Sequence, residues 1–201
     1  LIDYAVANIK KAENFRTNYR SYSNNLNIDF DLTVNAAILG DSLTLAAGSG
    51  DVTFDNAIGG STALGNLNIT TGALTAAAIK AQGTITVNNS ASSAITGIIS
   101  DGATAAILTK TGAGILTLSG NSSYTGTTTI SVGTISLTHA NGLGTTGGST
   151  TIESGAQLTI ATDLIVAEDM NISGTGISSA GVINSSGAIT LSGDINVVAT
   201  S

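Results

Sequence analysis

The chain has 201 residues, with 13 acidic and 6 basic side chains and a net charge of −7. Phosphate groups are bound by clustered Lys and Arg, so this charge disfavours nucleic acid and anionic membrane surfaces as partners. The absence of cysteine excludes a disulfide framework and thiol catalysis.

Hydrophobic residues make up 42% of the sequence and charged residues 9%, which is enough apolar material to bury a core. Aromatic residues are only 3%, and Trp and Pro are absent. The core must therefore be built from Ile, Leu, Val and Ala, which suits thin, regular layers. No apolar run is long enough to span a bilayer, and no signal peptide is visible. Because the chain begins at Leu1 rather than Met, we expect a segment of a longer protein.

The first 26 residues carry apolar side chains at gaps of three or four, which is the spacing of one helical face. The residues that share this spacing are Ile2, Val6, Ile9, Ala12, Phe15, Tyr19, Tyr22 and Leu26. We therefore predict an amphipathic α-helix over residues 1–26, acting as a linker or cap. A separate domain is expected to follow over residues 27–201.

From residue 27 onward the apolar period changes to two, with Thr, Ser and Asn between the aliphatic residues. This alternation is the signal of a β-strand, and Gly, Asn, Asp and Ser mark turns between the strands. The alternating pairs include Leu32/Val34, Leu43/Leu45, Val52/Phe54, Leu67/Ile69, Ile85/Val87, Leu116/Leu118, Ile130/Val132, Ile135/Leu137, Leu158/Ile160, Leu164/Val166, Met170/Ile172, Ile189/Leu191 and Ile195/Val197. The sequence from residue 27 is therefore expected to be all-β.

A β-sandwich and a β-solenoid both show such alternation. A sandwich calls for longer strands with aromatic core anchors, whereas here medium aliphatics recur with Asn, Ser, Thr and Gly. This monotony favours a right-handed parallel β-helix over residues 27–201, in which each coil stacks on the next. With roughly 20–25 residues per coil, about seven or eight coils fit.

Residues 108–137, LTKTGAGILTLSGNSSYTGTTTISVGTISL, contain the most regular pattern. This segment resembles the passenger-associated repeat of bacterial autotransporters. The matching residues are Leu108, Lys110, Gly112, Gly114, Leu116, Leu118, Gly120, Asn121, Tyr124, Gly126, Thr128, Ile130, Gly133 and Ile135. Residues 139–160 resemble the next coil of such proteins, and residues 47–70 are similar to segments of large haemagglutinin-like surface proteins.

Each residue type in this segment has a predicted structural role. Inward-facing aliphatics are expected at Leu116, Leu118, Ile130 and Val132. The glycines at 112, 114, 120, 126 and 133 are expected to allow positive φ where coils turn. We expect Tyr124 to cover a coil edge or to cap the core near a turn, and Lys110 to be a solvated turn residue.

Two features of the sequence could indicate nucleotide binding or catalysis, but the residues around them do not support either function. Residues 142–147, GLGTTG, match the pattern G-x-G-x-x-G, but a strand pattern follows where a dinucleotide fold needs a helix. His139 is the only histidine, in a predicted turn, with no second His or Cys for a metal site or a triad. We therefore expect neither nucleotide binding nor His-dependent chemistry.

Some β-helices cleave polysaccharides with converging carboxylates, so the acidic residues were weighed as well. The closest group in sequence is Asp163, Glu168 and Asp169. In a strand, residues 168 and 169 would point to opposite sides, whereas in a turn they could converge. No Arg occurs beyond residue 20. We predict a protein that is not an enzyme, with no catalytic residue, cofactor or metal, and no small-molecule pocket.

The resemblance implies a structural and adhesive rod segment, secreted or displayed at the Gram-negative cell surface. It also implies export through an outer-membrane barrel of the same parent chain, with host-cell or matrix components as partners. An inert spacer or secretion-folding scaffold is the first alternative. A flagellin-like filament subunit is the second, because residues 2–26 loosely resemble the C-terminal helix of flagellins.

Overall fold

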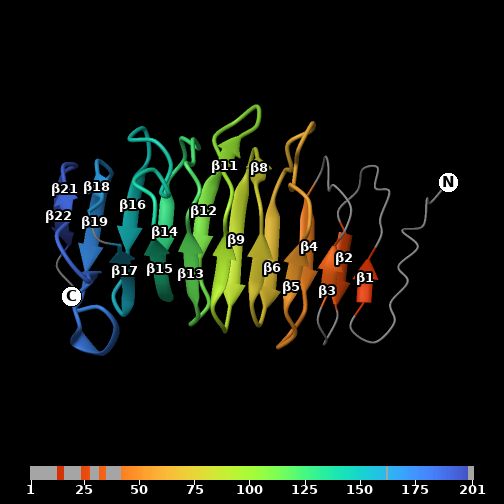
Figure 1. Cartoon of the computed structure of the whole chain (residues 1–201), viewed down its shortest axis with the longest axis horizontal. Helices are drawn as coiled ribbons and strands as arrows, with labels where there is room; N and C mark the ends of the chain where they lie inside the picture. The colour runs from red at the N-terminus through yellow and green to blue at the C-terminus, as the bar shows by residue number, and fades with distance from the viewer. Residues whose placement is uncertain (1–12, 16–23, 28–31, 35–41, 162, 199–201) are drawn as a thin grey trace.

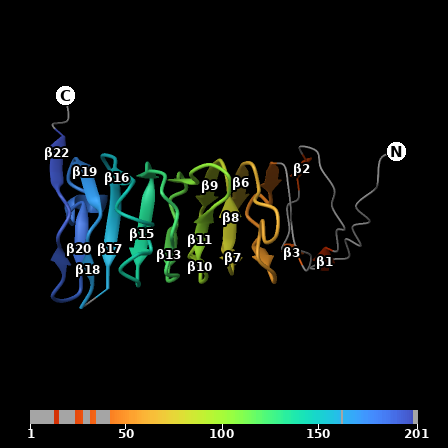
Figure 2. The same cartoon turned by 90° about the horizontal axis from the view of Figure 1, so that it is seen from above.

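The computed structural model describes residues 13–15, 24–27, 32–34, 42–161 and 163–198 of the chain. Strands and short turns follow one another in a stack that runs steadily from β1 to β22 along the long axis (Figure 1). The view from above shows two rows of strands facing each other along the same axis (Figure 2). The described chain is therefore built as a rod of stacked coils.

Within the described residues, two long sheets form the main sides of this rod. The first long sheet has the spatial order β1 (Glu13–Phe15), β3 (Leu32–Val34), β5 (Val52–Phe54), β7 (Leu74–Ala76), β10 (Ser93–Ile95), β13 (Ile115–Leu118), β15 (Gly133–Leu137), β17 (Ala156–Ile160), β20 (Ile183–Ser185). The second long sheet has the order β2 (Asn24–Asn27), β4 (Leu43–Ala46), β6 (Leu67–Thr71), β9 (Thr84–Asn89), β12 (Ile107–Lys110), β14 (Thr128–Ile130), β16 (Ser149–Ile152), β19 (Asp169–Ser173), β22 (Ile195–Val198).

A third side carries shorter strands. There β8 (Ile79–Ala81) pairs with β11 (Ile99–Asp101), and β18 (Ile165–Val166) pairs with β21 (Thr190–Leu191). One coil thus runs from the second long sheet to the first, then along the third side and back. The described residues contain a single helical turn, the 3-10 turn η1 (Ile177–Ser179), and no helix in them has the length and apolarity to cross a membrane.

Strand pairing is parallel throughout and links each coil to the next. The register advances by as few as 18 residues, from Leu67 to Ile85, and by as many as 25, from Met170 to Ile195. From β4 to β22 the second long sheet takes seven such steps. The all-β, parallel solenoid prediction is confirmed for the described residues.

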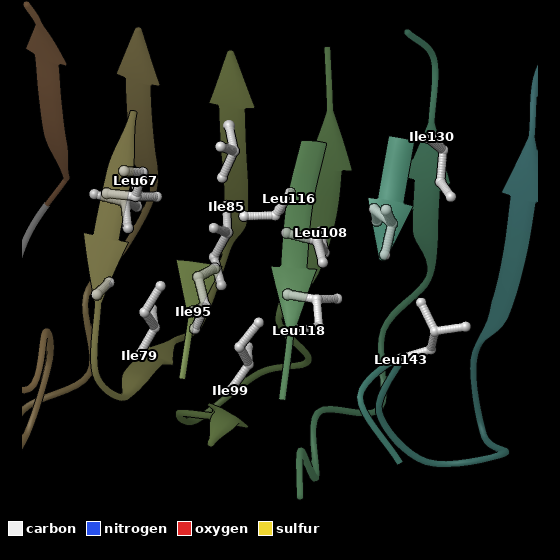
Figure 3. Packing of buried hydrophobic residues seen from close by; sticks show 14 of the residues in the cluster. Leu67, Ile79, Ile85, Ile95, Ile99, Leu108, Leu116, Leu118, Ile130 and Leu143 are labelled. Carbon is white, nitrogen blue, oxygen red and sulfur yellow. The ribbon is translucent and has the colours of Figure 1, made fainter. Parts of the chain in front are cut away.

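Alternation along the strands separates a buried column from a partly exposed one. In the second long sheet one inward column has aliphatic side chains at Leu45, Ile69, Val87, Ile130 and Ile152, with Lys110 between Val87 and Ile130. The neighbouring outward column consists of Thr and Asn, at Thr44, Asn68, Thr86, Thr109, Thr129, Thr151, Asn171 and Asn196. Figure 3 shows Ile85, Leu108, Leu116 and Leu118 directed into the space between the sheets.

The predicted N-terminal helix is wrong wherever the structure describes it. β1 and β2 are strands, and they pair in parallel with β3 and β4 at an offset of 19 residues. Pairing with a neighbouring coil supplies backbone hydrogen bonds that outweigh a local spacing of three or four. The remaining residues of that prediction lie outside the described part of the chain.

Candidate functional site

Residues 108–137 fill consecutive positions in the rod: the end of β12, all of β13, an irregular segment, and then β14 and β15. Six large aliphatic side chains of the segment are fully buried in the common core: Leu108, Leu116, Leu118, Ile130, Ile135 and Leu137. Val132 was also predicted to face inward. Its side chain is instead 45% exposed, at the short corner between β14 and β15. The strand ends at Ile130, so the inward alternation does not continue to Val132.

The glycines of the segment allow coils to approach each other closely. A Cβ at Gly112 or Gly120 would collide with backbone atoms of the preceding coil, at Asn89 and Gly97 respectively. Gly114 and Gly126 face backbone carbonyls of the preceding coil in the same way. Of the five glycines only Gly133 has a positive φ, of 76°. The prediction that all five serve positive φ is therefore wrong for four of them.

Lys110 lies inside the rod, which corrects its prediction as a solvated turn residue. It occupies the inward column between Val87 and Ile130, and its side chain is fully buried. The Nζ atom donates hydrogen bonds to the carbonyl oxygens of Gly112 and, at 3.4 Å, Val132. Burial lowers the pKa of Lys110 to about 8 from 10.5. The aliphatic stem packs in the column as Val87 and Ile130 do, while the amine binds the backbone carbonyl oxygens of Gly112 and Val132.

Two earlier coils place buried polar side chains near the same corner. The Thr71 hydroxyl donates to the carbonyls of Gly50 and Ala73, so it joins two coils. The Asn89 amide donates to the carbonyls of Ala91, at 2.6 Å, and Ile115. Asn89 Oδ1 is buried and has no hydrogen-bond partner in the described chain. Thr71, Asn89 and Lys110 each join a carbonyl of their own coil to one in a neighbouring coil.

Of the two positions predicted for Tyr124, a coil edge or the core, the structure shows the core. The ring is fully buried, and its hydroxyl lies 2.6 Å from Thr128 Oγ1. Burial raises the pKa of Tyr124 well above its usual value, so the hydroxyl is neutral. Gly144, with a φ of 94°, lies against this ring, and a Cβ there would approach two ring atoms at 3.1 Å.

The three acidic residues weighed for catalysis do not converge. Asp163 and Asp169 are exposed, whereas Glu168, which lies just before β19, is only 5% exposed and points inward. Glu168 Oε1 accepts a hydrogen bond from Thr150 Oγ1 at 3.2 Å. Loss of solvation raises the pKa of Glu168 to about 7, with a smaller contribution from the Asp169 charge, while the Thr150 hydrogen bond opposes the shift. No group of metal-ligating residues occurs in the described part of the chain.

The remaining candidates have structural surroundings. His139 lies in a bend after β15, where its Nδ1 accepts a hydrogen bond from the backbone of Asn141 at 3.1 Å. Residues 142–147 form turns and lead into the strand β16, so the helix needed for pyrophosphate binding does not follow them. In the described part of the chain, neither His139 nor residues 142–147 thus form a site for nucleotide binding or catalysis.

The comparison with protein families decides what this segment is. The family model for the passenger-associated-transport-repeat matches residues 108–137. Together with the parallel solenoid, this repeat fits an autotransporter passenger β-helix. The repeat also points to a surface or secreted Gram-negative protein. Neither the curated proteins nor the solved structures that were searched contain a match.

The geometry of the passenger repeat explains its pattern. Its leucines and isoleucines build the core, its glycines admit the neighbouring coil, and its Lys and Tyr place polar atoms inside. Sequence reasoning missed the buried hydroxyls of Thr128 and Thr150. A signal was available, because each lies two residues before an inward isoleucine, Ile130 or Ile152, and so shares its face.

Proposed function

We propose that this chain is a rod segment of an autotransporter-type passenger, displayed at the cell surface or secreted, and that it has no catalytic activity. The observation that carries the proposal is that the passenger repeat at residues 108–137 is a continuous part of the solenoid core. The absence of catalysis is supported by the separation of Glu168 from Asp163 and Asp169, which face outward. Parallel crossover connections are nearly always right-handed, so we infer a right-handed coil.

Export of such a passenger would use an outer-membrane barrel of the same parent chain. In the middle of the rod each strand of the second long sheet pairs with the strand of the coil before it over three or four residues, so folding outside the cell would proceed by addition of coils. A coil that has stacked must unfold before it can move back. The stacking itself would therefore favour outward movement, with no residue devoted to transport.

We propose the outward face of the second long sheet as the adhesive surface. Its central column consists of Thr and Asn at eight successive levels, from Thr44 to Asn196. The corresponding column of the first long sheet is interrupted by Ala94. Repeated hydroxyl and amide groups offer many weak contacts, whose sum gives useful avidity to host-cell or matrix components.

The second candidate is an inert spacer or folding scaffold. The large exposed aliphatic side chains in the middle of the rod include Ile98, Ile115 and Val132, which lie at turns and strand ends. This candidate is favoured because such positions do not place the apolar side chains along the face of a sheet, where a binding partner would contact them together. The flagellin-like alternative depends on a helix near residues 2–26, and the described parts of that segment, β1 and β2, are strands.

The test is binding of the purified full chain to immobilised matrix proteins and host-cell membranes. Saturable binding is expected, and it should be lost in the triple variant Thr86→Lys, Thr109→Lys, Thr129→Lys. The matched control places the same charges on the first long sheet, in Thr75→Lys, Thr117→Lys, Thr159→Lys. Absence of binding by the unchanged chain, with a β-type circular dichroism spectrum, would leave the spacer. Equal loss in both variants would exclude the assigned face.

A further inference from the structure

A line of buried polar side chains crosses three levels of the second long sheet. Tyr124 precedes β14 and lies within hydrogen-bond distance of Thr128 in β14. Thr128 is the register partner of Thr150 in β16, and both side chains are fully buried. Thr150 donates to Glu168, which lies just before β19. In this inward column the two threonines stand between Leu108 and Met170, so hydroxyls replace aliphatic side chains there.

The line ends on an ionisable group that no cation balances. In the described chain the basic side chains are Lys80, Lys110 and His139, on β8, on β12 and after β15, and none forms an ion pair with Glu168. The titratable groups near Glu168 are the neutral hydroxyl of Tyr124 and the carboxylate of Asp169. Asp169 in turn accepts a hydrogen bond from the backbone of Asp194 at 2.8 Å. An ionised Glu168 would therefore be a buried charge with one hydroxyl donor.

The position of Glu168 connects the body of the rod to its last level. Its carboxyl contacts β16, the residue after it begins β19, and its backbone carbonyl lies against Gly193, just before β22. We propose that Glu168 is a pH-dependent latch, which holds β19 and β22 on β16 when it is protonated and loosens them when it is ionised. The proposal does not depend on adhesion or on the passenger assignment.

The direction of the pH effect follows from proton linkage. The pKa of Glu168 is raised from 4.5 to about 7 in the folded chain, so between these values the folded state binds more protons than the unfolded state. Stability of the last coils is therefore greatest at acidic pH and falls as the pH rises through 7. Above that pH this group causes no further change. The rod would be most tightly closed in acidic surroundings.

The test is hydrogen exchange of the full chain between pH 5 and pH 8.5, corrected for the intrinsic pH dependence of exchange. Amides of residues 163–198 are expected to lose protection as the pH rises, while those of residues 107–137 keep theirs. One pKa unit corresponds to about a tenfold change in the opening equilibrium, so we expect a loss of about tenfold or more. Glu168→Gln keeps the shape without the charge, and should abolish the pH dependence.

Two further variants separate a latch from a merely structural role. Thr150→Val removes the donor to the carboxylate, and should move the transition to higher pH. Asp169→Asn removes an exposed charge beside Glu168, and should move it to slightly lower pH. A carboxyl titration of Glu168 followed by carbon NMR should have its midpoint near 7. A midpoint near 4.5, or an unchanged pH dependence in Glu168→Gln, would overturn the proposal.

Discussion

The middle of the rod and its last level carry the same sequence signal but differ in burial. Ile152 in β16 and Val197 in β22 occupy the same inward column of the second long sheet, yet their exposed fractions are 0% and 74%. β16 is flanked on both sides, by β14 and β19, whereas β22 has one partner strand in the described chain. In a solenoid the core is thus supplied by neighbouring coils, and alternation alone does not make a residue buried.

Replacing an isoleucine by alanine should lower the free energy of unfolding more in the middle of the rod than at its last level. This difference is the largest effect we expect. Ile152→Ala removes a fully buried side chain between two coils, and should lower the free energy of unfolding by about 3 kcal/mol. Ile195→Ala acts on a side chain in β22 that is 44% exposed, and should cost less than about 1 kcal/mol. Urea unfolding of both variants measures the difference. Equal costs would show that β22 is covered in solution.

The second prediction concerns coil spacing in the middle of the rod. Gly120→Ala places a Cβ against the carbonyl of Gly97 in the preceding coil, which must then move away. Such overpacking should lower the free energy of unfolding by about 2 kcal/mol. Gly60→Ala is the control, because nothing lies within 4 Å of its Cβ position. A control variant as unstable as Gly120→Ala would contradict the spacing argument.

The third prediction concerns Lys110 in the middle of the rod, where a substitution should have the smallest effect at pH 7. Because burial lowers the pKa of Lys110 to about 8, the unfolded chain binds more protons between pH 8 and 10.5, and stability should rise over that range. Lys110→Met keeps the apolar stem and should remove this rise, with a net change on the order of 1 kcal/mol at pH 7. Chemical denaturation at pH 7, 9 and 10.5 measures it, with Lys80→Met expected to keep the rise.

The sequence was sufficient for the all-β class because strand alternation is a local property. Pairs such as Leu67/Ile69 and Leu158/Ile160 are strands with both side chains in the core. The errors concern what a residue meets in another coil. Position 120 must be a glycine because the backbone of Gly97, which lies 23 positions earlier, leaves no room for a Cβ there. No local signal in the sequence shows that contact.

The candidate site was less accessible to sequence reasoning for the same reason. Lys110 was expected in solvent because a lysine is rarely buried, but its column partners Val87 and Ile130 come from other coils and fix its direction. For Glu168 and Asp169 the sequence left open whether the side chains diverge, as in a strand, or converge, as in a turn; only Asp169 lies in a strand, and only Glu168 is buried. Its hydrogen bond with Thr150 depends on coil length, which the sequence does not specify.

The register between coils also determines how the rod bears a load. The ladder hydrogen bonds point along the rod axis, so a pull between β4 and β22 stretches one level after another in series. Each level that opens frees a coil of 18 to 25 residues, from the shortest to the longest register step. At roughly 3.4 Å per extended residue, this is about 60–85 Å of chain. The rod would therefore lengthen in discrete steps under tension, and dissipate mechanical work at each of them.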